Sequence, residues 1–233
     1  MHLRNNLIKY LTIAVLSLFV MTACDKDNVV ITGDDVPPPP PTPGDFVIPN
    51  IIPDGDEKYL NEDSDYIFDQ DRLHTFELWL PKANLAKIDA DPSAEIYVPG
   101  TLVFEGDTVS PVGIRYKGSV GAWVGCLSGT DWANPSGHKI CTKLSMKIKI
   151  NWEGREEKFF KLRKLQFHSQ NLDDSKMRER LGYWLFRQME VPAPRSVHAR
   201  LMINGEYSGV YALTEQIDGR FVKHNFDDDD GNL

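Results

Sequence analysis

Residues 204–218, NGEYSGVYALTEQID, predict the turn and outgoing strand of a β-hairpin that ends in polar residues. Asn204-Gly205 suits a type I′ turn, because both residues tolerate positive φ. This turn pairs Ile203 with Glu206, so we expect Gly209 to face Arg200 and to allow a close approach there. One predicted face carries Val197, Ala199, Leu201, Val210 and Ala212. The opposite face carries His198, Arg200, Met202, Tyr207, Tyr211 and Leu213.

A strictly alternating segment lies upstream of this hairpin. Residues 143–150 place Leu144, Met146, Ile148 and Ile150 on one face and Lys143, Ser145, Lys147 and Lys149 on the other. This period of two is typical of a strand with one buried face. Glu153-Gly154 predicts a turn, and residues 159–167 return with apolar and basic side chains interleaved. The two segments therefore predict a basic antiparallel hairpin.

Residues 175–189 predict the main helix of the chain. Asp173 or Asp174 can cap its first turn, and Pro192 ends it because proline cannot continue the hydrogen-bond ladder. Helical spacing relates Met177, Leu181, Trp184, Leu185 and Met189, with Arg178, Glu179, Arg180 and Arg187 on the polar side. Residues 74–80, 96–104 and 109–117 add strands, with a short helix near 82–89. The expected fold is α+β, an antiparallel sheet with one main amphipathic helix.

The N-terminus has the features of a lipoprotein signal. Basic residues precede an apolar run too short to span a bilayer comfortably, and Met21-Thr22-Ala23 stands directly before Cys24. We expect residues 1–23 to be a signal peptide and Cys24 to be lipidated, which would attach the protein to a membrane. Residues 24–45 are a Pro-rich tether, residues 46–73 an extended lead-in, and residues 74–233 the folded domain.

The net charge and the cysteine pair limit which classes of partner and site this protein can have. A formal net charge of -8 argues against a nucleic-acid surface. Cys126 and Cys141 flank a segment rich in Gly, Ser and Asn, and in an exported protein such a pair predicts a disulfide. A metal site that includes Asp131 and His138 is the alternative.

Four motifs in order resemble the CotH kinase family, the spore coat protein H group. They are Gly113 to Ser119 (GIRYKGS), Lys143 to Ile148 (KLSMKI), Asp174 to Glu179 (DSKMRE), and above all Asn204 to Asp218 followed by Phe221. The resemblance covers residues 74–233. It implies the small lobe of an atypical protein kinase, and we expect the large lobe, which holds the catalytic and metal-binding aspartates, to lie outside these residues.

The resemblance also implies ATP and Mg²⁺ as cofactors. Kinases hold nucleotide phosphates with a strand lysine that a helix glutamate positions. Lys143 or Lys147, held by Glu179, would form that pair, and Lys161 and Lys164 compete for the role. Arg115 and Lys117 would support a loop over the phosphates at residues 117–121, and Glu215 and Gln216 would lie near the nucleotide base. Read from the pattern alone, lysines at every second position also fit a solvated strand face.

Two functions follow from these patterns. The first is an ATP-dependent kinase that phosphorylates Ser or Thr of proteins at the cell surface or in the periplasm, anchored as an outer-membrane or cell-surface lipoprotein of a Gram-negative bacterium. The second is a non-catalytic surface lipoprotein that binds or scaffolds a partner. A third reading, a carbohydrate-associated module, depends only on Trp123, Trp132 and Trp152 as stacking platforms.

Overall fold

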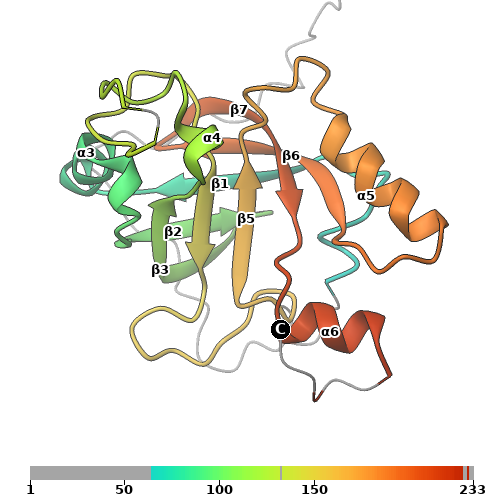
Figure 1. Ribbon diagram of the computed structural model, residues 1–233. Helices are drawn as coiled ribbons and strands as arrows, with labels where there is room; N and C mark the ends of the chain where they lie inside the picture. Colours follow the sequence, from blue (N-terminus) through green and yellow to red (C-terminus); the bar gives the residue numbers. More distant parts are fainter. Residues whose placement is uncertain (1–63, 132, 228–229, 231–233) are drawn as a thin grey trace, which may run out of the picture. The chain divides into compact units, whose positions relative to one another are not determined.

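The computed structural model describes residues 64–131, 133–227 and 230 (Figure 1). The predicted signal peptide 1–23, the lipidation site Cys24 and the tether 24–45 lie outside the described residues, as do positions 46–63 of the lead-in and Trp132. The described part of the lead-in, residues 64–73, differs from the extended segment that we expected. It forms turns and buries Ile67 and Phe68, because these side chains join the apolar core.

Seven strands in the described residues close into a barrel (Figure 1). They are β1 (His74–Trp79), β2 (Val98–Phe104), β3 (Asp107–Tyr116), β4 (Met146–Lys149), β5 (Lys164–His168), β6 (Ser196–Ile203) and β7 (Glu206–Thr214), in the spatial order β1-β2-β3-β4-β5-β7-β6. All neighbours pair antiparallel except β1 and β6, which run parallel. The α+β class is confirmed, but the sheet is mixed and not antiparallel. The pattern within one strand does not specify its partner, and the long chain between β1 and β6 permits a parallel pair.

Four α-helices accompany the barrel within the described residues. They are α3 (Lys82–Ala90), α4 (Val120–Trp123), α5 (Arg178–Gln188) and α6 (Gly219–Asn225), with a 3₁₀ turn at Pro92–Ala94. Helix α5 begins later than predicted, and its N-cap is Met177 in place of Asp173 or Asp174. Asp173 still contacts the first turn, since its carboxylate accepts the backbone N–H of Arg178 at 2.8 Å. Asp218 caps α6 by accepting from Arg220 N at 3.0 Å. No described helix has the length and apolar character needed to cross a membrane.

The barrel interior buries the faces that alternation predicts. Met146 and Ile148 of β4 are 0% exposed and Leu165 of β5 is 1% exposed. The two strands pair as the predicted hairpin, with Met146 opposite Phe167 and Ile148 opposite Leu165. Their outward residues, including Lys147, are only partly buried. The inner face of this hairpin is thus part of the core, and its outer face carries the basic side chains.

The register of β6 and β7 departs from the prediction at one residue. Ile203 pairs with Glu206 as expected, but an irregularity after Met202 places Gly209 opposite Leu201. Gly209 has φ +134, a conformation that L side chains rarely adopt, so the glycine permits the bulge. One extra residue moves every later side chain to the other face. Tyr211 and Leu213 therefore share the core face with Leu201, in place of Val210 and Ala212, although Ala212 is buried on the other face as well.

Helix α5 packs on the barrel through its polar side. It contacts β6 and lies beside that strand (Figure 1). Arg180 donates from Nε to Gln70 Oε1 at 2.9 Å and from an NH2 nitrogen to Gln70 O at 2.6 Å. Its apolar residues face away, with exposures of 51% for Leu181, 45% for Trp184 and 53% for Leu185. The helix is amphipathic, but its apolar side is not the side that meets the barrel.

Candidate functional site

The outer face of β3, β4 and β5 concentrates positive charge. Arg115 lies opposite Lys147 across β3 and β4, and Lys164 belongs to the next strand. Burial lowers the pKa of Lys147 to about 8, with further lowering by the charges of Lys164, Arg115 and Lys117. Because the register pairs Arg115 with Lys147, their like charges lie close together and disfavour the charged form of Lys147. Glu95 pairs with Arg115 and offsets part of this repulsion at Lys147. An anion bound at the cluster would relieve the rest.

Lys117 connects this cluster to helix α5. It directly follows β3, and its Nζ donates to Gln166 Oε1 at 2.8 Å and lies 2.8 Å from His168 Nε2. His168 Nδ1 in turn lies 2.6 Å from Glu179 Oε1, in the first turn of α5. Burial lowers the pKa of Lys117, and the negative charge of Glu179 opposes that effect. A lysine and a helix glutamate are thus joined through one imidazole ring.

Glu179 is fixed from a second direction by the end of β7. The Thr214 hydroxyl donates to Glu179 Oε1 at 2.6 Å and lies 3.1 Å from the Ser196 hydroxyl. Burial alone would raise the pKa of Glu179, but the hydrogen bonds from His168 and Thr214 outweigh it and lower the pKa. The carboxylate therefore stays ionised near neutral pH and can act only as an acceptor.

Two of the predicted phosphate ligands, Lys143 and Lys147, lie in different surroundings. Lys143 Nζ donates to Val210 O at 2.6 Å and lies 4.7 Å from the centroid of the Tyr211 ring. Burial lowers the pKa of Lys143 to about 8. Lys147 belongs to the basic cluster, but the bonds of the Glu179 carboxylate go to His168 and Thr214. The pair with Glu179 that we expected at Lys143 or Lys147 is instead made through Lys117.

Glu215 and Gln216 follow β7 and differ in their contacts. The Glu215 carboxylate is buried and accepts from Arg195 Nε at 3.0 Å and from an Arg195 NH2 nitrogen at 2.6 Å. Arg195 also bonds Asp65 and Ser64, so this ion pair fastens the start of the described chain to the end of β7. In contrast, the buried Oε1 of Gln216 accepts no hydrogen bond from the described residues. It remains an acceptor for a donor group of a ligand.

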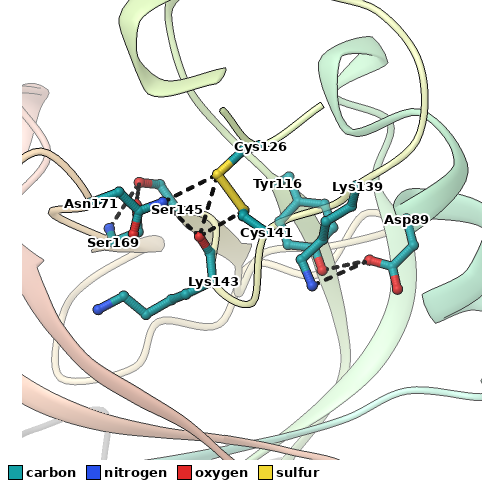
Figure 2. Close-up of a disulfide and its surroundings, with 9 residues drawn as sticks. All are labelled: Asp89, Tyr116, Cys126, Lys139, Cys141, Lys143, Ser145, Ser169 and Asn171. Carbon is teal, nitrogen blue, oxygen red and sulfur yellow. Dashed lines mark hydrogen bonds and ion pairs between the residues drawn. A yellow bond between two sulfur atoms is a disulfide. The ribbon is translucent and has the colours of Figure 1, made fainter. Parts of the chain in front are cut away.

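A disulfide joins Cys126 to Cys141, the two cysteines that the sequence pairs (Figure 2). The loop between them is held to α3, since Lys139 N donates to Asp89 O at 2.8 Å. Next to the disulfide, Asn171 Nδ2 donates to Lys143 O at 2.8 Å (Figure 2). The disulfide therefore constrains the chain segment that joins Lys117 to β4. Asp131 lies in this loop, and its carboxylate accepts a hydrogen bond within the loop, from Ala133 N at 2.9 Å.

Of the three tryptophans that could act as stacking platforms, the two described ones are poorly placed for that role. Trp123 is 6% exposed and belongs to the core. Trp152 lies against Tyr97, with ring centroids 5.3 Å apart, and Lys149 Nζ is 5.7 Å from its ring. These contacts favour structural roles for both rings.

Comparison with known proteins identifies the group to which this architecture belongs. The family model described as CotH kinase protein matches residues 114–233. The chain belongs to the CotH family. The match includes β4, β5, α5, β6 and β7, and hence Lys117, His168 and Glu179. No curated protein matches the chain.

The sequence pattern indicates some of these site residues more clearly than others. The sequence places Lys117 in a predicted loop over the phosphates, whereas it does not single out His168. Its signal is the alternation of β5, where Lys164, Gln166 and His168 share the outward face. Arg195 has a weaker signal, because nothing in the local pattern shows that it meets a glutamate twenty residues away.

Proposed function

We propose that this CotH-family protein binds ATP and serves the phosphorylation of Ser or Thr in exported proteins. The observation that carries the proposal is the chain from Lys117 through His168 to Glu179, beside a cluster of further cations. Phosphoryl transfer needs fixed cations at the phosphates, and a lysine tied to a helix glutamate supplies one. The family match over the same residues supports this reading.

The described residues fit a nucleotide better than they fit its metal ion. The cations suit the phosphates, and Gln216 Oε1, close in sequence to Thr214, offers an acceptor for an amino group such as that of adenine. In the described part of the chain, no group of three His, Cys, Asp or Glu side chains is arranged to hold a metal. We therefore assign no residue to Mg²⁺.

Binding of Mg-ATP to the full chain, measured by isothermal titration calorimetry, tests the proposal. Lys117→Ala should weaken binding about tenfold or more, because a charge-assisted bond to phosphate is lost. Lys149→Ala is the matched control, since Lys149 is a lysine of β4 that lies over the Trp152 ring. Its affinity should stay within about twofold of the wild type. A folded wild-type protein that binds no Mg-ATP would overturn the proposal.

Transfer activity separates catalysis from binding alone. The chain is extended by the large lobe that the family resemblance implies and is incubated with labelled Mg-ATP and an acceptor protein rich in Ser and Thr, and phosphate transfer is measured. Transfer that Lys117→Ala reduces supports the kinase. ATP binding without any transfer would instead favour the alternative, a surface module that binds a partner without catalysis.

We also propose that Cys24 anchors the protein in the outer membrane or at the cell surface, where its protein substrates would be found. The proposal is supported by the apolar run and the small residues that precede Cys24. Labelling with a fatty-acid analogue in a Gram-negative host should tag the wild type and not Cys24→Ser. Equal labelling of both proteins would contradict the anchor.

A further inference from the structure

A histidine stands where kinase chemistry calls for direct contact between a lysine and a glutamate. The Lys117 ammonium contacts His168 Nε2 at 2.8 Å, and the opposite ring nitrogen contacts Glu179 Oε1 at 2.6 Å. We propose that His168 is a positioning residue that holds the Lys117 ammonium toward a phosphate while it is itself held by Glu179. This inference rests on the proposed function, because it assigns the target of Lys117 as a nucleotide phosphate.

The chemistry of the partners selects one tautomer of His168. An ammonium group has only N–H donors, so Lys117 must donate and Nε2 must accept. The Glu179 carboxylate, whose pKa is lowered, can only accept, so Nδ1 must carry the ring proton. The ring is therefore neutral, with its proton on Nδ1. A proton on Nε2 would place two donors against each other and break the link to Lys117.

The same contacts leave part of the ammonium available. Lys117 has three N–H donors, and its printed bonds go to Gln166 Oε1 and His168 Nε2. Gln166 and His168 are two residues apart on the outward face of β5, so one strand fixes both acceptors. Among the contacts of the described residues, one N–H of Lys117 remains for a ligand oxygen.

The imidazole also keeps the two charges apart. In a direct ion pair the carboxylate would take an N–H of the ammonium and neutralise its charge at contact. Here Glu179 Oε1 already receives the Thr214 hydroxyl at 2.6 Å and the ring nitrogen at 2.6 Å. The Glu179 carboxylate therefore has its hydrogen-bond donors without any contact to the Lys117 ammonium. The charge of Lys117 is then available to an anion near Lys147, beside the ion pair of Arg115 and Glu95.

The first test is spectroscopic and needs no nucleotide. In ¹⁵N-labelled full-length protein, the His168 ring should show a protonated Nδ1 and an unprotonated Nε2 at neutral pH. The Lys117 side-chain ammonium should give an observable, slowly exchanging ¹⁵Nζ signal, which His168→Leu abolishes. A His168 ring protonated at Nε2, or a Lys117 signal that persists in folded His168→Leu, would overturn the inference.

The second test measures Mg-ATP affinity. His168→Leu should weaken binding about tenfold, as expected for loss of one well-placed hydrogen bond to a charged group. His168→Gln, whose amide oxygen can accept from Lys117, should lose less. Equal losses in the two variants would show that the acceptor is irrelevant and would overturn the assignment. His198→Leu is the matched control, because His198 bonds Lys176 O at 2.7 Å and lies outside the chain to Lys117.

The two tests separate failure of the inference from failure of the proposed function. A wild-type protein that shows the predicted tautomer and Lys117 signal but binds no Mg-ATP would refute nucleotide binding and keep His168 as the residue that positions Lys117. A protein that binds Mg-ATP equally well with leucine at position 168 would keep the function and refute the positioning role.

Discussion

Strand β4 and helix α5 are both amphipathic in sequence, but they direct their apolar sides oppositely. Met146 and Ile148 of β4 are 0% exposed, whereas Trp184 and Leu185 of α5 are 45% and 53% exposed. Both patterns correctly predicted the kind of element. The direction of the apolar side, however, depends on the surface that the element meets, and a sequence pattern does not describe that surface.

The surface under α5 explains the difference. It presents polar groups of the barrel and of residues that flank it, including Gln70, His168 and Thr214, and each bonds a polar residue of the helix. A buried polar group without a partner is costly, so polar residues of the helix must cover this surface. The helix is thereby attached by directional bonds, whereas β4 is attached by apolar packing and its ladder.

The sharpest contrast is between a truncation in the β4–β5 hairpin and one on α5. Phe167→Ala, in β5 opposite Met146, should lower the free energy of unfolding by about 3 to 5 kcal/mol, because Phe167 is 0% exposed and leaves a cavity. Leu185→Ala on α5 should change it by less than about 0.5 kcal/mol. Urea unfolding followed by circular dichroism measures both values. Similar losses for the two variants would show that the apolar side of α5 is covered in solution.

A moderate effect is expected on the polar side of α5. Arg180→Met removes two hydrogen bonds to Gln70 and should cost about 1 to 3 kcal/mol of unfolding free energy. Arg178→Met is the matched control, since the Arg178 side chain is 75% exposed. Its cost should be below about 1 kcal/mol. Equal costs would mean that directional bonds are not what attaches the helix.

The smallest effect concerns the outward face of β4. Lys147 should titrate with a pKa of about 8 because burial and neighbouring cations disfavour its charged form. Lys164→Gln removes one of those cations, so the pKa of Lys147 should rise toward the usual lysine value. Triphosphate at the cluster should raise it as well. NMR titration of the lysine side chains measures both shifts, and a pKa that falls in either case would contradict the cluster.

Local elements were predictable because their signals are local. The Asn204-Gly205 turn and the faces of β4 both depend on residues within a few positions of each other. The bulge at Gly209 was the first point of failure, since one extra residue reverses every later side chain. The sequence pattern predicts a close approach at Gly209, but it does not predict that this glycine takes part in a bulge.

The site was less predictable because its contacts join distant segments. The sequence pairs Glu179 with Lys143 or Lys147, whereas the lysine linked to it is Lys117, through a histidine that lies on a third element. Glu215 belongs to the most specific family motif, and its carboxylate is taken up by Arg195. Strand order decides which side chains meet across a closed sheet. The sequence pattern of a single strand does not specify that order.

The pairing of β1 with β6 has a consequence for the order in which the protein can fold. His74 pairs with Ala199, so β1 remains without this neighbour until most of the described chain has been synthesised. Contacts between such distant segments slow folding, and an unpaired strand edge is a template for association with other chains. Early in synthesis, β1 through β5 can form only an open sheet. The nascent protein is therefore expected to need protection from aggregation until β6 and β7 emerge and close the barrel.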